Sequence, residues 1–278
     1  MMPNIDVQDI ELDLLIEGLY RQFGYDFRNY SKAHLKRRLL ARVVTDSLDS
    51  ISQLQHLLFH QPGYLERVLS DFSINVTELF RDPSFFQMLR NEIVPILKTY
   101  PKIKIWHAGC SSGEEVYSMA ILLKEEGLYD RAQIYATDFN DKILNVAKEA
   151  IFPIGIMKSY SKNYIAAGGK EDFSDYFITD GKSIILNSNL QENIIFAHHN
   201  LVSDGDFAEM HLIVCRNVLI YFNNKLQNRV FKLFDKSLIN NGVLCLGSQE
   251  TLKYADIYPK YSTIDNKMPT YQKMNKHL

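Results

Sequence analysis

The chain has 278 residues, and its 31 lysines and arginines against 33 aspartates and glutamates give a formal net charge of −2. A hydrophobic fraction of 46% with 23% charged residues excludes a disordered or fibrous chain, and the near-zero charge argues against a protein that holds nucleic acid by neutralising phosphates. Three separated cysteines exclude a disulfide framework, and no apolar run reaches the roughly 18 residues of a membrane helix, so we expect a cytoplasmic protein without membrane insertion.

The first part of the chain has a helical pattern. Apolar residues recur at helical spacing from Ile10 to about Phe72, which predicts an all-α N-terminal domain over residues 1–73. Ser31 and Ser50 stand where N-caps of two of these helices are expected.

From Lys102 onward, short β-rich runs alternate with helical stretches. The predicted strands are Ile103–Trp106, Ala132–Thr137, Asn193–Phe196, His211–Cys215 and Val243–Leu246, and the predicted helices are Glu114–Glu126, Lys142–Ala150 and Asn224–Ile239. This alternation predicts a doubly wound, Rossmann-like α/β sheet over residues 84–278. A turn at Asp180-Gly181 between short β runs predicts a small antiparallel β insert at about 152–192.

A glycine loop joins the first predicted strand to the first helix of this domain. Gly109 and Gly113 allow a sharp turn and a close approach of the backbone to a ligand, and Glu114 and Glu115 follow at the helix start. Two carboxylates there would repel a pyrophosphate and suit a ligand that carries positive charge. The alternative is that both only complement the helix dipole.

The second predicted strand ends in Asp138, 25 residues after Gly113. An acidic residue at this place binds ribose hydroxyls in dinucleotide-binding folds, although an aspartate at a strand end alone is more often a turn former. Adenosine recognition combined with a preference for positive charge indicates S-adenosylmethionine rather than NAD.

Three segments of the sequence also carry a family resemblance. They are Asn75-Val76-Thr77-Glu78-Leu79-Phe80-Arg81, Trp106-His107-Ala108-Gly109-Cys110-Ser111-Ser112-Gly113-Glu114-Glu115-Val116-Tyr117-Ser118 and Cys215-Arg216-Asn217-Val218-Leu219-Ile220-Tyr221-Phe222. In this order they resemble the motifs of the CheR family of chemoreceptor methyltransferases. The resemblance implies methylation of receptor glutamates to glutamyl methyl esters during chemotaxis adaptation, with S-adenosyl-L-homocysteine as the second product.

The resemblance also implies roles for individual residues. A linker at residues 74–83 would contribute to the active site, and Arg81 and Tyr221 would be catalytic. The implied cofactor-binding residues are Asn75, Thr77, Arg81, Glu115, Asp138, Asn200, Leu201, Arg216 and Asn217. The chain departs from the family pattern at His107, where a small residue is usual, at Val116, where proline is common, and at Leu79, where phenylalanine is common. These departures remove no polar group from the implied site.

Elementary chemistry supports such a reaction without a general base. A glutamate side chain has a pKa of about 4.3, so it is already an anionic nucleophile near neutral pH. Exclusion of water and in-line alignment would then accelerate the transfer. Arg81 could orient the carboxylate and Tyr221 could donate a hydrogen bond; the alternatives are a surface arginine and a core aromatic residue.

A basic helix is predicted from Lys32 onward. Its residues Lys36, Arg37, Arg38 and Arg42 would dock the acidic cytoplasmic helices of chemotaxis receptors by charge complementarity, unless they form only a solvated face. We expect a monomer and no metal site, since His56 and His60 lack the glutamate of a zinc protease helix. Two alternatives remain: a nucleotide-dependent oxidoreductase, and a catalytically weak signalling regulator that binds S-adenosylmethionine.

Overall fold

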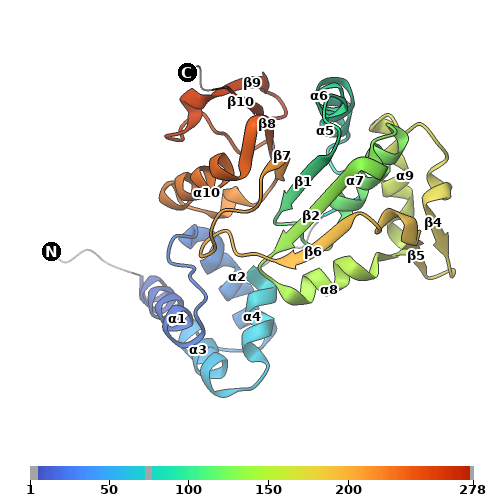
Figure 1. Cartoon of the computed structure of the whole chain (residues 1–278). Helices are drawn as coiled ribbons and strands as arrows, with labels where there is room; N and C mark the ends of the chain where they lie inside the picture. Colours follow the sequence, from blue (N-terminus) through green and yellow to red (C-terminus); the bar gives the residue numbers. More distant parts are fainter. Residues whose placement is uncertain (1–5, 73–76, 276–278) are drawn as a thin grey trace. The chain divides into compact units, whose positions relative to one another are not determined.

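A computed structural model of the chain describes residues 6–72 and 77–275. The chain divides into two compact units (Figure 1). The helical unit comprises Met1–Ile74 and Ile220–Arg229, and the α/β unit comprises Asn75–Leu219 and Val230–Leu278. Among the described residues, no helix combines the length and apolarity that a membrane span requires.

The described part of the helical unit confirms the predicted all-α character. Its helices are α1 (Val7–Phe23), α2 (Lys32–Thr45), α3 (Ile51–His60) and α4 (Tyr64–Phe72). Local signals set their ends: the side chain of Ser50 accepts a hydrogen bond from the backbone N–H of Gln53 at 3.2 Å, and Gly24 ends α1 in the left-handed region. Ser31 takes the N-cap position of α2 but makes no capping bond with its side chain. Leucines and isoleucines at helical spacing, such as Leu15 and Leu54, are fully buried in its core.

The segment Ile220–Arg229 belongs to the helical unit although it lies far along the chain. The backbone N–H of Ser31 donates to the carbonyl of Tyr221 at 2.7 Å, and the rings of Tyr30 and Phe222 meet edge-on at 4.9 Å. Sequence periodicity does not indicate this grouping, because it depends on contacts between residues about 190 positions apart.

The α/β unit contains a seven-stranded sheet with the order β6-β2-β1-β7-β8-β10-β9. The strands are β1 (Ile103–Ala108), β2 (Ala132–Asp138), β6 (Ile194–His198), β7 (Met210–Cys215), β8 (Leu238–Leu246), β9 (Tyr261–Asp265) and β10 (Thr270–Lys273). Strands β6, β2, β1, β7 and β8 run parallel, as the sequence predicts, whereas β10 and β9 join antiparallel. The hairpin of β9 and β10 was not predicted.

Helices cover both faces of this sheet. They are α5 (Pro83–Met88), a π turn (Leu89–Ile93), α6 (Val94–Lys98), α7 (Glu114–Glu125), α8 (Asp141–Glu149), α9 (Met157–Ala166) and α10 (Asn224–Ser237). Successive residues of a strand point to opposite faces. Ile105 of β1 therefore packs in the core that includes α7, whereas the ring of Trp106 meets Phe234 of α10 edge-on at 5.5 Å.

The predicted antiparallel insert is present as a separate three-stranded sheet. Its strands are β3 (Ile151–Pro153), β5 (Ser183–Leu186) and β4 (Phe177–Thr179), in that spatial order. Asp180 closes the β4–β5 turn by accepting hydrogen bonds from the backbone N–H groups of Lys182 and Ser183. The hydroxyls of Tyr164 and Tyr176 both reach the buried carboxylate of Glu125 at the end of α7, which ties the insert to the main sheet.

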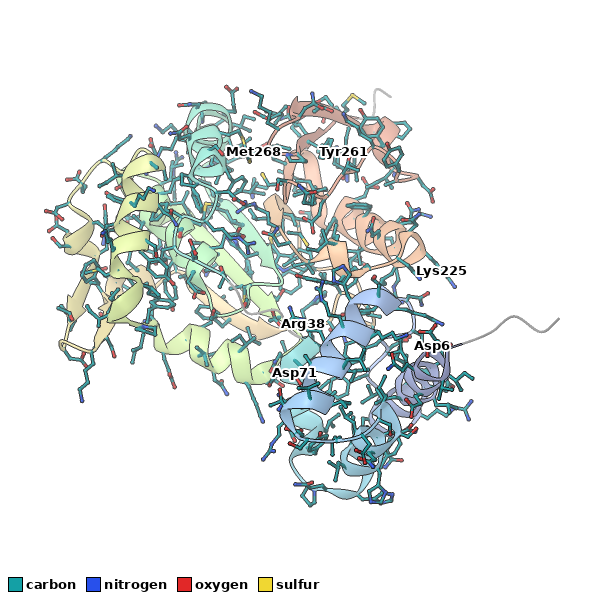
Figure 2. The ribbon with its side chains drawn as sticks, turned by 180° about the vertical axis from the view of Figure 1, so that it is seen from behind. Asp6, Arg38, Asp71, Lys225, Tyr261 and Met268 are labelled. Atoms are coloured by element: carbon teal, nitrogen blue, oxygen red, sulfur yellow. The ribbon has the colours of Figure 1, made fainter. Side chains whose placement is uncertain are left out.

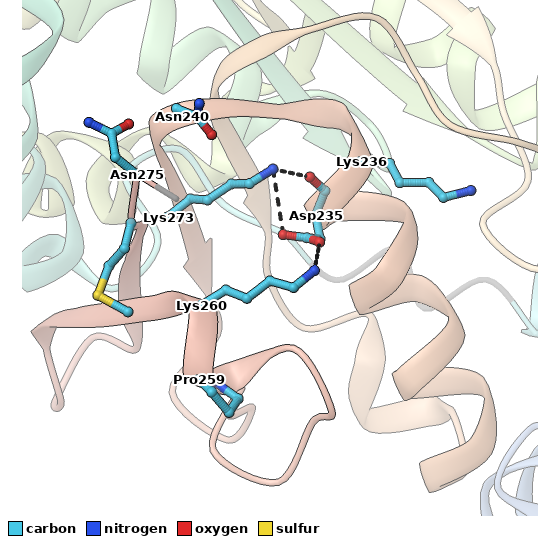
Figure 3. Close-up of a pocket in the computed structure, with 8 residues that line it drawn as sticks. Asp235, Lys236, Asn240, Pro259, Lys260, Lys273 and Asn275 are labelled. Atoms are coloured by element: carbon cyan, nitrogen blue, oxygen red, sulfur yellow. Dashed lines mark hydrogen bonds and ion pairs between the residues drawn. The ribbon is translucent and has the colours of Figure 1, made fainter. Parts of the chain in front are cut away.

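A cavity of about 620 Å³ lies between the end of α10 and the C-terminal hairpin (Figure 3). It is lined by Asp235, Lys236, Asn240, Pro259, Lys260, Lys273, Met274 and Asn275. Asp235 lies 2.6 Å from the Lys260 ammonium and 3.5 Å from that of Lys273, and Lys273 also donates to the carbonyl of Leu238 at 3.0 Å. These lysines are thus engaged in joining the hairpin to α10, and none of the predicted site residues lines this cavity.

We expect Asp235→Asn to lower the free energy of unfolding by about 1–3 kcal/mol at pH 7 because two ammonium groups lose their partner. Burial opposes ionisation of Asp235, but the hydrogen bond from Lys260 and the charge of Lys273 outweigh it and lower the pKa. A lowered pKa stabilises the fold above the unfolded value of about 3.9, and the difference between wild type and variant should shrink as the pH falls below it. Urea unfolding at several pH values measures this.

The control is Asp256→Asn, whose 2.7 Å ion pair with Lys232 is exposed on both sides. This change should cost less than about 0.5 kcal/mol. An equal effect of both substitutions would show that the ion pairs of Asp235 do not hold the hairpin.

Candidate functional site

The loops that follow β1, β2 and β6 meet at the carboxyl edge of the sheet. The backbone N–H groups of Gly109 and Cys110 both donate to the carbonyl of Thr137 at 2.8 Å. The backbone N–H of Ser111 donates to the carboxylate of Asp138 at 3.1 Å, and that of His199 donates to the Asp138 carbonyl at 3.1 Å. This edge of the sheet is where open α/β sheets bind their ligands.

Gly109 brings the loop after β1 against the loop after β7. Its φ is +82°, and a Cβ atom at this position would lie 2.6 Å from Cγ2 of Val218. Gly113, with φ of +91°, stands at the start of α7. The glycine loop therefore has the sharp turns that the sequence predicts, and no side chain fits at Gly109.

Glu115 and Arg216 form the centre of an ion network at this edge. Arg216 Nη1 lies 2.8 Å from Glu115 Oε2, and Arg216 Nη2 lies 2.5 Å from Asp82 Oδ2. The other carboxylate oxygen of Glu115 lies 3.1 Å from Nδ1 of His107. The Arg216 guanidinium also stacks 4.0 Å above the ring of Phe85, so the arginine is held from three sides.

The electrostatics of the network favour a cationic ligand. Burial opposes ionisation of Glu115, but the charge of Arg216 and the hydrogen bond with His107 outweigh it and lower its pKa to about 2. Glu115 is therefore a carboxylate at neutral pH. Two carboxylates, those of Glu115 and Asp82, surround a single guanidinium, which leaves an excess of negative charge beside the start of α7.

The structure separates the two glutamates that the sequence analysis treated as a pair. The carboxylate of Glu114 accepts a hydrogen bond from Ser112 Oγ at 2.7 Å and lies 3.5 Å from the hydroxyl of Tyr160, and its burial raises its pKa. Adjacent helical residues point about 100° apart, so only Glu115 reaches the Arg216 network. Glu114 and Glu115 therefore lie in different surroundings, Glu114 against Ser112 and Tyr160 and Glu115 against Arg216 and His107.

The remaining predicted cofactor residues have defined places in the α/β unit. Asp138 is buried; its burial raises its pKa, while the backbone N–H groups of Asn140 and Ser111 act in the opposite direction. Asn200 follows β6 and accepts a hydrogen bond from the backbone N–H of Val202 at 3.0 Å, and Leu201 beside it is buried.

The predicted residues of the linker and the catalytic pair are distributed over both units. Thr77 and Arg81 are partly buried in the α/β unit, and Arg81 immediately precedes Asp82 of the network. Asn75 lies outside the described residues. Tyr221 belongs to the helical unit, where its ring meets His34 of α2 edge-on at 5.3 Å.

Glu250 is a site residue that the sequence analysis missed. Its buried carboxylate accepts hydrogen bonds from the backbone N–H groups of Asn217, Val218 and Leu219 at 2.7–3.1 Å, and from Gly247 at 2.7 Å. Glu250 thereby fixes the loop that carries Arg216 and Asn217. Its position just after β8, at the same edge as the other loops, was the available signal.

Backbone strain concentrates at this edge. Of the seven non-glycine residues with positive φ in the described parts of the chain, three lie in the loops at this edge: Asp82, Ser111 and Asn217. Such conformations cost about 1–3 kcal/mol each and cluster at functional sites. The strain supports a role of this edge in binding.

These residues fit S-adenosylmethionine. An ionised carboxylate at the start of α7 suits the cationic part of the cofactor, and Asp138 at the end of β2 suits its ribose. The fold and the site together define a Rossmann-like methyltransferase that uses this cofactor.

Comparison with known proteins gives the family. Residues 75–267 match the SAM-binding domain of CheR methyltransferases, and residues 10–73 match their all-alpha domain. The chain belongs to the CheR methyltransferase family. It is 49% identical over 247 residues to "Putative methyltransferase Cher3" of Pseudomonas putida. The aligned region covers 89% of this chain and 90% of that protein.

More distant relatives are named chemotaxis protein methyltransferase. That of Listeria innocua is 29% identical over 250 residues, which covers 88% of this chain and 92% of the relative. That of Borreliella burgdorferi is 29% identical over 268 residues, which covers 90% of this chain and 91% of the relative.

We expect Glu250→Gln to weaken binding of S-adenosylhomocysteine about tenfold. The amide group of glutamine would turn N–H donors toward backbone N–H donors, which leaves buried donors unpaired at about 1–3 kcal/mol each and loosens the loop of Arg216. Titration calorimetry measures the affinity.

The matched control is Glu209→Gln, the same chemical change at an exposed glutamate of the same unit. It should leave the affinity unchanged. Equal affinities of both variants would show that Glu250 does not support the site.

Proposed function

We propose that the protein transfers the methyl group of S-adenosylmethionine to glutamate side chains on the cytoplasmic helices of methyl-accepting chemotaxis receptors, forming glutamyl methyl esters. The observation that carries the proposal is the ionised Glu115 beside Arg216 at the carboxyl edge, in a chain of the CheR family. The names of the relatives from Listeria innocua and Borreliella burgdorferi support a substrate in chemotaxis.

Each cofactor-site residue has a proposed task. Glu115 binds the cationic amino group, Asp138 binds the ribose, and Asn200 and Leu201 lie at the adenine end. The other proposed contacts come from Asn75, Thr77, Arg81, Arg216 and Asn217. When bound, the cofactor supplies an electrophilic methyl group on a positively charged sulfur.

The protein must position the acceptor, a receptor glutamate, rather than activate it. A glutamate carboxylate is already ionised near neutral pH, so the reaction needs no proton acceptor. Arg81 orients the acceptor carboxylate through its guanidinium, and Tyr221 donates a hydrogen bond to the reacting group. Exclusion of water strengthens both interactions and brings the carboxylate to the methyl group without its hydration shell.

Some cations of the proposed receptor-docking surface on α2 form ion pairs within the helical unit. Lys36 lies 2.6 Å from Asp6 and 2.8 Å from Asp9, and Arg42 lies 2.7 Å from Asp71, so their charges are held within the helical unit. Arg37 is exposed and lies 3.3 Å from His34, the residue against which the ring of Tyr221 packs.

Arg38, seen on α2 in Figure 2, is partly buried, and its Nε has no hydrogen-bond partner among the described residues. Arg37 and Arg38 therefore carry the docking proposal, with Lys36 and Arg42 as secondary contributors.

We expect the protein to transfer labelled methyl groups from S-adenosylmethionine to a receptor fragment, with release of methanol under alkaline conditions.

Tyr221→Phe should lower kcat about tenfold while the affinity for S-adenosylhomocysteine stays within twofold, because only a hydrogen bond to the reacting group is lost. Arg81→Ala should lower kcat/KM about a hundredfold because the acceptor loses its guanidinium.

Receptor fragments whose methylatable glutamates are replaced by alanine provide the control and should take up no label. A protein that binds S-adenosylhomocysteine yet methylates no receptor glutamate would contradict the proposal and favour the catalytically weak regulator.

We expect Arg37→Glu/Arg38→Glu to lower kcat/KM for the receptor fragment at least tenfold at low salt, because the on-rate of an acidic helix depends on these charges. The affinity for S-adenosylhomocysteine should not change, and the defect should diminish as salt is added. Initial rates at several salt concentrations measure this.

The variant Lys102→Glu/Lys104→Glu changes the net charge equally at two exposed lysines near the start of β1. It should methylate the receptor normally. If both double variants lose activity to the same degree, the proposal that α2 is the docking surface is wrong.

A further inference from the structure

His107 is a buried histidine in direct contact with Glu115, the residue whose carboxylate is proposed to bind the cofactor. It lies on β1, is 1% exposed, and its Nδ1 is 3.1 Å from Oε1 of Glu115. Its second nitrogen, Nε2, is also buried and has no hydrogen-bond partner among the described residues. The sequence motif that resembles the CheR family usually has a small residue at this position.

The contact defines which ring nitrogen carries the proton. The carboxylate of Glu115 only accepts hydrogen bonds, so Nδ1 must be the donor. The N–H at Nδ1 therefore points toward Oε1 of Glu115.

Two donors then fix the carboxylate of Glu115. Arg216 donates to Oε2 at 2.8 Å and His107 donates to Oε1 at 3.1 Å, so the carboxylate cannot rotate without breaking one of these bonds. Each carboxylate oxygen has two lone-pair directions, so both can still accept a hydrogen bond from a ligand. A small residue at position 107 would leave Oε1 without this donor.

We propose that His107 is a positioning residue that holds Glu115 in the orientation in which it receives the cationic amino group of S-adenosylmethionine. The inference rests on the proposed function, because that function assigns the amino group to Glu115. His107 acts through Glu115 and touches neither the methyl group nor the acceptor.

The test compares two ligands that differ at the amino-acid end. S-adenosylhomocysteine carries the amino group, whereas 5′-methylthioadenosine has the same nucleoside thioether without the amino acid. His107→Ala removes the donor and His107→Gln places its amide near the position of Nε2, whereas His107→Asn places an N–H donor near that of Nδ1. Calorimetry gives each affinity, and the thermal unfolding midpoint of each variant reports its folding.

The expected result is selective. His107→Ala and His107→Gln should weaken the binding of S-adenosylhomocysteine about tenfold. The affinity for 5′-methylthioadenosine should stay within twofold of wild type, because only S-adenosylhomocysteine has the amino group that Glu115 binds. His107→Asn should restore binding of S-adenosylhomocysteine to within about threefold of wild type. In the background of Glu115→Gln, His107→Ala should cause no further loss.

Other results would show whether the positioning role of His107 or the proposed function is wrong. Equal weakening of both ligands, or equal behaviour of the asparagine and glutamine variants, would overturn the positioning role and leave the proposed function intact. Wild-type protein that binds neither ligand would overturn the proposed function and this inference together.

Discussion

The buried guanidinium of Arg216 is the interaction on which the candidate site depends. It joins three segments that are distant in sequence: the start of α5 through Asp82, the start of α7 through Glu115, and the loop after β7. Removal of such a charge from water costs several kcal/mol, which only well-placed partners can offset. Two carboxylates and the face of Phe85 provide these partners. The arrangement is therefore stable only when all three segments adopt their native positions.

The rest of the α/β unit serves to hold these segments. Parallel strands bring the ends of β1, β2 and β7 to one edge, and the carboxylate of Glu250 fixes the backbone after β7 from the neighbouring strand. The positive φ angles at Asp82, Ser111 and Asn217 are unfavourable locally. They persist because hydrogen bonds and the core beneath the sheet determine the backbone path more strongly than local preference does.

Local patterns predicted the fold well because the relevant information is local. Strand–helix alternation, the glycine loop and the acidic end of β2 can each be recognised within a short window of sequence. The tertiary features could not be read in this way. Glu250 reaches the loop of Asn217 from 33 positions away, and the hairpin of β9 and β10 has no helix between its strands.

The charges of α2 show the same limit, because the carboxylates that hold Lys36 and Arg42 come from other parts of the helical unit. Asp6 and Asp9 lie at and near the start of α1, and Asp71 lies near the end of α4. A helix sequence alone reveals its own charges but not the opposite charges that fold against it. The structure thus shows that two of the four candidate cations, Lys36 and Arg42, form ion pairs within the helical unit.

The protonation state of Glu115 suits binding of a cation rather than proton transfer. A carboxyl with a pKa of about 2, such as that of Glu115, takes up no proton between pH 5 and 8. Burial keeps the pKa of the Cys110 and Cys215 thiols well above the usual range, so neither supplies a thiolate nucleophile. Such a site can hold a cation in a fixed position, and methyl transfer to an acceptor that is already ionised requires positioning and a dry environment more than it requires acid–base catalysis.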